Sequence, residues 1–532
     1  MEPDNMNYPG AAWPAPAKVE PHKAENAFKP DMLDFTFALA VFVLGYLFSR
    51  WVLLSWQGWG VSAFTTAYLL CATAYLIKKG AFENSRATWF WLAVTFATGT
   101  SYALWVNMGF EAVRACFLFC AAVYYVIIAS GRAVLGRTGN FLFIDGINAV
   151  IVVPFRNLIN QYVSFSALGK GKRRGKILPV ILGVLLALLL AAVLIPMLER
   201  ADSGGFGVIL CFFENIVRLI DAETMMFIIL AIPIAAYMYG LVSGVAHRKG
   251  TDLINPESVK KTVGALRVMP PATVYIVLGA VCGIYLVFIL SQMPYFFSAF
   301  TGRRPEGWLV YSEYARRGFF ELCTIASINI AVLTVANVTC RRLRMESPAL
   351  KAMNVTLAII TLVLIATAFS KMAMYIGAYG LTMPRLLPCV FMVFLAALSA
   401  ALVALQKWDF SIVRFALVAG SVLLCGLCLS NPDAIVVRYN TGRYLGGTLP
   451  EYDVDILFRS DSAGVLPAIE VFEATEDMEL KDKLAGYLRY RSEVSGVNGA
   501  SGANGVGGRG SGLSLESYRA RERLAAIRDI LP

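Results

Sequence analysis

The sequence predicts an all-α polytopic membrane protein with about 11 transmembrane helices and a small, mainly helical domain after the last of them. Composition is the first reason: 58% of the 532 residues are hydrophobic, only 16% are charged, and the mean hydropathy is +0.62. A soluble chain has about half apolar and about a quarter charged residues. The second reason is that the apolar residues lie in runs of about 20, the length with which a helix crosses a bilayer while bonding its own backbone.

Each predicted span is one such run, and short polar loops separate them. The expected spans are 32–54, 58–77, 87–107, 110–130, 177–198, 224–246, 271–293, 318–339, 352–376, 386–406 and 411–429. Only a few residues separate 87–107 from 110–130, so these two helices are expected to form a tight hairpin.

The stretch 140–168 is apolar but is not counted as a span. Polar residues and a proline interrupt it, among them Asp145, Pro154 and Asn157. We expect this stretch to lie in the membrane interface.

The orientation is predicted from the basic residues, which concentrate in alternate loops such as 170–176 and 341–344. Lysine and arginine are enriched in cytoplasmic loops, so these loops are expected inside the cell. An odd number of spans then places the N-terminus in the cytoplasm and the C-terminus outside a plasma membrane. The net charge of +11 is therefore attributed to topology and to contact with anionic lipid head groups in the bilayer, and not to nucleic-acid binding.

Composition also divides the chain into parts. These are a cytoplasmic polar N-terminal tail (1–31), the transmembrane bundle with basic cytoplasmic loops (32–429), an extracytoplasmic C-terminal domain (430–493), a Gly/Ser/Asn-rich linker (494–513) and a C-terminal amphipathic helix (514–532) that docks back. The tail lacks the short apolar core and small-residue cleavage site of a signal peptide, so none is expected.

No cofactor or metal is expected. His22 and His247 are the two histidines of the chain, which leaves almost no imidazole for a metal or haem. Cys425 and Cys428 form a CxxC on a membrane helix, where two small core residues are the simpler interpretation. The chain also lacks a P-loop, a GxGxxG after a strand and a GxSxG, so an enzyme is the least supported class.

Polar side chains at membrane depth are the better place to look for function, because each one needs a partner or water. Asn329 and Asn337 are eight residues apart and share one helix face. They either hydrogen-bond to a neighbouring helix or line a permeation path. Lys371 lies near the outer end of its helix, from which its side chain can reach the interface.

Two polar edges predict an extracytoplasmic vestibule. The segment YSEYARRGFFE (311–321) carries carboxylates, guanidinium groups and phenols directly into a span, and YIGAYGLTMPR (375–385) turns the chain between two helices. The candidate binding residues are Glu313, Tyr314, Arg316, Arg317, Glu321, Lys371, Tyr375, Tyr379 and Arg385. The alternative is that these side chains only anchor helices at the interface.

These two segments and a third, NPDAIVVRYN (431–440), resemble bacterial membrane proteins of the domain of unknown function 4173 family, which is related to the 4153 group. The C-terminal half of the chain carries the resemblance, whereas the first spans are similar only in hydropathy. The resemblance implies a membrane fold and a cellular location, but no activity.

Two function hypotheses follow. In the first, the protein is a transporter or small-molecule receptor whose vestibule admits a charged solute. In the second, it is a non-enzymatic envelope sensor or scaffold, and 430–493 binds an envelope protein partner. The acidic side chains of that region suit protein contact, although acidic surfaces are common on soluble domains.

Overall fold

The computed structural model describes residues 28–53, 58–106, 109–133, 142–165, 183, 222–247, 264–291, 311–341, 346–494 and 514–527. Within these ranges every regular element is helical, and the single bridge is an isolated one between Met269 and Cys340. The prediction of an all-α protein is confirmed.

Among the residues that the structure describes, ten long helices make up the apolar part. They are α1 (Met32–Trp51), α2 (Trp59–Lys78), α3 (Arg86–Leu104), α4 (Glu111–Ala129), α10 (Ala222–Ala246), α12 (Pro271–Ser291), α14 (Tyr311–Thr339), α15 (Pro348–Tyr379), α16 (Met383–Ala404) and α17 (Ile412–Leu429). Within the described ranges, nine of these are long and apolar enough to cross a membrane, and α3 is the exception. The structure therefore supports a membrane protein, and the expected span 177–198 lies outside the described residues.

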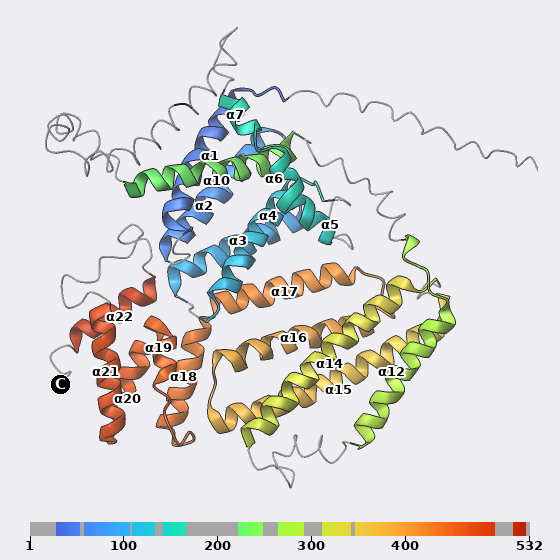
Figure 1. The fold of residues 1–532 in the computed structure, drawn as a ribbon, viewed down its shortest axis with the longest axis vertical. Coiled ribbons are helices and arrows are strands. Elements are labelled where there is room, and N and C mark those ends of the chain that lie inside the picture. The colour runs from blue at the N-terminus through green and yellow to red at the C-terminus, as the bar shows by residue number, and fades with distance from the viewer. Residues whose placement is uncertain are drawn as a thin grey trace, which may run out of the picture.

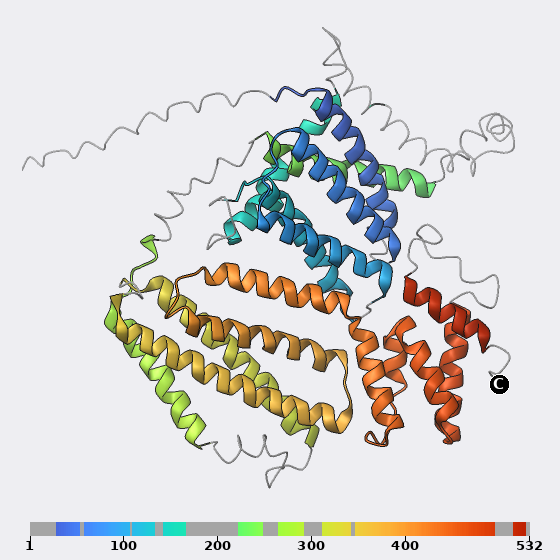
Figure 2. The same ribbon diagram turned by 180° about the vertical axis from the view of Figure 1, so that it is seen from behind.

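The long helices form two groups, one above the other in Figures 1 and 2. The N-terminal group contains α1 to α4 and α10, and the C-terminal group contains α12 and α14 to α17. Helix α17 contacts both α16 and α3, so it joins the two groups. Each group has its own cluster of buried apolar side chains.

Close approach of backbones holds the N-terminal group together. A Cβ atom on Gly45 of α1 would lie 2.7 Å from the carbonyl oxygen of Ala231 on α10, so only glycine fits there. Ala235, on the same face of α10, lies next to that position. Small residues at a crossing are the usual way in which membrane helices pack, because lipid offers no hydrophobic drive for association.

The interrupted stretch 140–168 folds as short helical turns. They are α5 (Leu142–Ile147), the π-helix η1 (Asn148–Val152), α6 (Val153–Arg156) and α7 (Asn160–Phe165). Helix α6 packs on α10, where a Cβ atom at Gly240 would lie 2.5 Å from the carbonyl oxygen of Pro154. Phe143 and Phe155 are exposed on the outer side. The location of the stretch 140–168 in the membrane interface stays a prediction.

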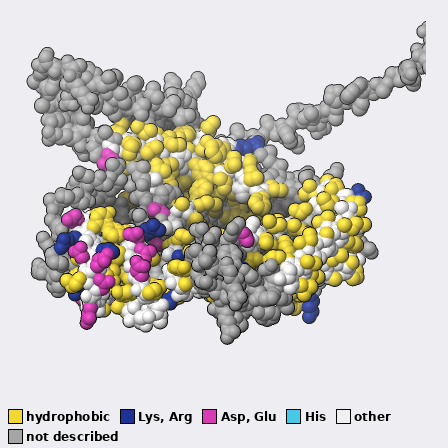
Figure 3. Space-filling model, turned by 60° about the horizontal axis from the view of Figure 1, so that its bottom comes forward, with side chains coloured by type: hydrophobic (Ala, Val, Ile, Leu, Met, Phe, Trp, Pro, Cys, Tyr) yellow, Lys and Arg dark blue, Asp and Glu magenta, His cyan; other side chains and the backbone are white. Residues whose placement is uncertain are grey.

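The chain continues into a compact set of shorter helices. They are α18 (Pro432–Leu445), α19 (Asp455–Arg459), the 3₁₀ helix η5 (Asp461–Gly464), α20 (Val465–Ala474), α21 (Met478–Val494) and α22 (Leu515–Ala526). Their core includes Val437, Leu457, Leu484 and Leu524. In Figure 3 charged side chains gather over these helices, whereas apolar side chains cover most of the described surface elsewhere. The predicted domain boundaries stay predictions. Val494, the first residue of the predicted linker, is the last residue of α21, and the rest of the linker lies outside the described residues.

Candidate functional site

The predicted vestibule residues fall into two sets. Glu313, Tyr314, Arg316 and Arg317 lie in the first turns of α14, and their side chains are outside the described part of the structure. Glu321, Lys371, Tyr375, Tyr379 and Arg385 are described. That the two sets form one binding site stays a prediction.

Arg385 caps the C-terminal end of α15. Its Nη1 donates to the carbonyl oxygen of Tyr379 at 2.8 Å and to that of Gly380, and its guanidinium lies over the ring of Tyr375 at 4.2 Å. The last carbonyls of a helix lack intrahelical donors, so a guanidinium there stabilises the turn. Tyr375 and Tyr379 also pack edge to face, at 5.4 Å between ring centroids. These contacts stabilise the turn after α15, and a binding role for the three residues stays a prediction.

Helix α18 also makes hydrogen bonds to the turn between α15 and α16. Asn440 accepts a hydrogen bond from the backbone nitrogen of Leu381 at 2.7 Å and donates to its carbonyl oxygen at 2.7 Å. Arg443 donates to the carbonyl oxygens of Ile376 and Gly377. The second and third sequence motifs, far apart in the chain, therefore meet in one polar contact.

Two other polar predictions also have identified partners. Glu321 is exposed on α14 and interacts electrostatically with half-buried Lys371 on α15. Asn329 and Asn337 each bond to α15. Asn329 donates to Thr361 at 3.1 Å, and Asn337 exchanges two hydrogen bonds with Asn354. Interhelical hydrogen bonding was one of the two interpretations for this pair, and the contacts support it over a permeation path.

A buried ionic cluster that sequence reasoning missed joins three helices. Asp34 of α1 is fully buried, and its Oδ1 accepts a hydrogen bond from Tyr75 of α2 at 2.6 Å. The same oxygen lies 3.0 Å from Lys79 Nζ and 3.0 Å from His247 Nε2. Lys79 also contacts Asp31 at 2.8 Å. The available signal was a carboxylate inside an apolar run and one of only two histidines in the chain.

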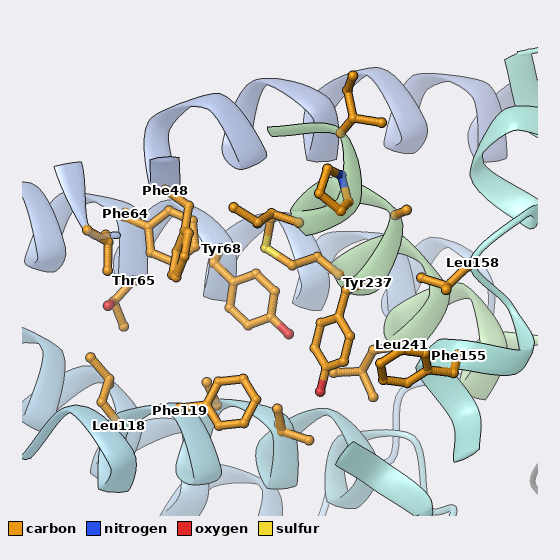
Figure 4. Close-up of a pocket in the computed structure, with 18 of the residues that line it drawn as sticks. Phe48, Phe64, Thr65, Tyr68, Leu118, Phe119, Phe155, Leu158, Tyr237 and Leu241 are labelled. Atoms are coloured by element: carbon orange, nitrogen blue, oxygen red, sulfur yellow. The ribbon is translucent and has the colours of Figure 1, made fainter. Parts of the chain in front are cut away.

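An apolar cavity of about 650 Å³ lies in the N-terminal group (Figure 4). Helices α1, α2, α4 and α10 surround it together with the α6–α7 turn; its lining includes Phe48, Phe64, Thr65, Tyr68, Leu118, Phe119, Ala122, Phe155, Leu158, Tyr162, Tyr237 and Leu241. None of the described side chains that line it is charged. Protein interiors leave few voids larger than a water molecule, and ligand sites have volumes of about 300–1,000 Å³. The cavity therefore has the size and chemistry of a binding site for an apolar molecule.

The junction of the two groups with the C-terminal helices is also polar. Trp105 lies just after α3, and its indole Nε1 donates to the carbonyl oxygen of Cys428 at 2.8 Å. The backbone carbonyl oxygen of Trp105 accepts a hydrogen bond from fully buried Arg114 at 3.3 Å. Glu516 of α22 accepts from Asn431 at 2.6 Å. Burial raises the pKa of Glu516 to about 7, and the Asn431 hydrogen bond opposes this effect.

No metal centre is evident in the described ranges, where no three His, Cys, Asp or Glu side chains come together in a way that could hold a metal ion. Cys425 and Cys428 are buried free thiols in the apolar core.

Comparison with known proteins supplies the family. A model described as a domain of unknown function, DUF4153, matches residues 64–470, which is most of the chain. The chain belongs to the DUF4153 family. The resemblance to the 4173 family is not shown, and the match is to the related group instead. No curated protein and no solved structure matches this DUF4153 chain.

The DUF4153 match covers most of the features described above. It runs from the second turn of α2 into α20 and so includes the capped α15–α16 turn, the contact from α18 and most of the cavity lining. Asp34 precedes the matched range, and Glu516 follows it. The family assignment names no activity and no ligand, and the support for a membrane protein comes from the long apolar helices.

Proposed function

We propose that this DUF4153 protein is a multi-pass membrane receptor or carrier for a small apolar molecule, which binds between α1, α2, α4 and α10. The observation that carries the proposal is the cavity of about 650 Å³ with its uncharged lining. The function class is the predicted one, but the site is different. The vestibule for a charged solute has less support, because Arg385 is used in capping a helix.

Access to the cavity from the bilayer supports this proposal. Phe119 and Phe155 belong to the lining, and their side chains are 40% and 60% exposed. Both exposed rings are apolar, as expected for side chains in contact with lipid. A molecule dissolved in the hydrocarbon could enter between these rings without crossing the head-group layer.

The proposed topology has 11 spans in a plasma membrane. Contacts between helix ends support it: Lys79 after α2 and His247 after α10 both meet the start of α1, so these ends share one face. The chain leaves α4 on that face, since Glu83 bonds to Ala129 there. Because α10 ends on the same face, one more crossing is needed between α4 and α10. With α3 and the predicted span 177–198 the total is 11.

The side of each face can be tested by labelling. A cysteine introduced at Gly446, exposed at the end of α18, is expected to react with a membrane-impermeant maleimide in intact cells. A cysteine introduced at Asn84, exposed in the α2–α3 loop, is expected to react only after lysis. The basis is the basic residues near that loop, Lys78, Lys79 and Arg86. The reverse pattern would overturn the orientation.

Filling the cavity is expected to abolish binding. Ala122 of α4 lines the cavity, and Ala122→Phe would place a ring inside it. The probe is a long-chain alkyl diazirine, added to the purified full chain in nanodiscs. It is expected to label peptides of α2 and α10 in the wild type. Labelling of this variant should be at least tenfold weaker, because a loss of about 1.4 kcal/mol in binding free energy already lowers the affinity tenfold.

The matched control is Ala112→Phe, on the exposed side of the same helix. It adds the same ring outside the cavity and should leave the labelling unchanged. Equal labelling in Ala122→Phe and Ala112→Phe would contradict the proposed site.

A sensor or scaffold is the second candidate function. The contacts that favour it are those of the C-terminal helices, since α18 bonds to the α15–α16 turn and α22 packs on α3. An envelope partner bound to these helices would act on both groups. The same cavity could then serve as the sensing site.

A further inference from the structure

Among the described residues that line the cavity, Tyr68 has a hydroxyl group without a hydrogen-bond partner. Tyr68 is only 7% exposed, and its Oη points into the cavity between Phe119 and Tyr237 (Figure 4). It makes no hydrogen bond with any residue that the structure describes. In an apolar cavity a hydroxyl that lacks a partner is unfavourable by about 1–3 kcal/mol, so such a group calls for an explanation.

The other hydroxyl groups of the lining differ from Tyr68. Thr65 donates to the carbonyl oxygen of Val61 at 2.8 Å, and Tyr237 donates to that of Val150 at 3.0 Å. Tyr162 lies on α7 and is only half-buried. In the described lining, Tyr68 therefore carries the hydroxyl that a bound molecule would satisfy.

The position of Tyr68 constrains the ligand. In Figure 4 its ring stands in the middle of the cavity, with Phe48, Phe64 and Thr65 on one side and Leu241 and Phe155 on the other. A molecule that fills the cavity would place apolar groups on both sides of the phenol. Its acceptor should then lie within the molecule and not at one end.

We propose that the cavity binds a neutral, lipid-soluble molecule with a hydrogen-bond acceptor, such as a ketone or ester carbonyl, flanked by apolar groups and bonded to Tyr68 Oη. This inference rests on the proposed function and adds the chemical class of the ligand. A charged molecule is disfavoured because no described lining side chain could pair with it, and an unpaired charge in an apolar site is costly.

The test is competition against the alkyl diazirine with two probes, 8-hexadecanone and n-hexadecane, which differ by one mid-chain carbonyl. In the wild-type full chain the ketone is expected to compete at about five- to tenfold lower concentration, the effect of one net hydrogen bond. Tyr68→Phe should remove this advantage and leave competition by hexadecane unchanged, which also shows that the variant is folded.

A matched control is Tyr125→Phe, which removes a buried phenol hydroxyl that bonds to Thr73 and does not line the cavity. It should keep the preference for the ketone. Equal competition by the two probes in the wild type, or a ketone preference that survives in Tyr68→Phe, would overturn the inference. Labelling that neither probe reduces, or that Ala122→Phe leaves intact, would instead overturn the proposed function.

Discussion

Replacing Asp34 with alanine is expected to lower the free energy of unfolding by about 3–5 kcal/mol, the usual cost of removing one partner of a buried ion pair. The carboxylate is fully buried, and the Asp34 side chain accepts from Tyr75, lies 3.0 Å from both Lys79 and His247, and bonds to the backbone nitrogen of Asp31. The variant leaves these donors without their acceptor. It should also loosen the ends of α1, α2 and α10 together, because the cluster joins all three.

Two further substitutions separate charge from geometry. Asp34→Asn keeps the shape and an acceptor oxygen, so it should lose less than the alanine variant. Asp31→Ala removes a carboxylate that is 61% exposed and caps α1, which typically costs about 1 kcal/mol. The measurement is the thermal unfolding midpoint of the purified protein, followed by tryptophan fluorescence. An Asp34→Ala midpoint no lower than that of Asp31→Ala would contradict a stabilising cluster.

Glu516 is expected to make the stability of the protein fall as pH rises from about 4.5 to about 7. Burial raises its pKa from 4.5 to about 7 in the folded state, so within this window the folded state binds more protons than the unfolded state. Above pH 7 the full cost of burying the carboxylate is present. Each pKa unit corresponds to about 1.4 kcal/mol, which sets an upper limit of about 3 kcal/mol.

Glu516→Gln removes this titration and retains an oxygen that can accept from Asn431. The variant should therefore unfold at a higher temperature than the wild type at pH 8, and the difference should shrink towards pH 5. Glu522→Gln, at an exposed position of the same helix, is the control and should follow the wild type at both pH values. A wild-type pH profile retained in Glu516→Gln would contradict the assignment to this carboxyl.

The sequence predicted the helices well, because a helix in lipid has to satisfy its own backbone and must be apolar over a known length. The run that begins at Met32 and the run that ends at Leu429 match α1 and α17 closely. Helix α3 is less apolar, since it carries Thr95, Thr98 and Ser101, which nevertheless lie buried against its neighbours.

The polar motifs were found, but their role depends on tertiary contacts. Nothing local to YIGAYGLTMPR says that Asn440, 59 residues beyond Leu381, will bond to that turn. Likewise, Asp34 and His247 are 213 residues apart and meet only because α1 and α10 pack together.

The cavity could not be predicted at all. Its lining residues, such as Phe64, Leu118 and Leu241, are ordinary members of apolar helices. A void depends on how far the helices diverge and on side-chain rotamers, and neither has a signature in composition or periodicity. The cavity and Tyr68 thus come from the structure alone.

Native mass spectrometry of the protein purified from its own membranes can show whether the cavity holds a small apolar molecule. We expect an additional neutral organic mass on the wild type and on Ala112→Phe, and no such mass on Ala122→Phe. The same bound mass on all three proteins, or on none of them, would contradict this expectation.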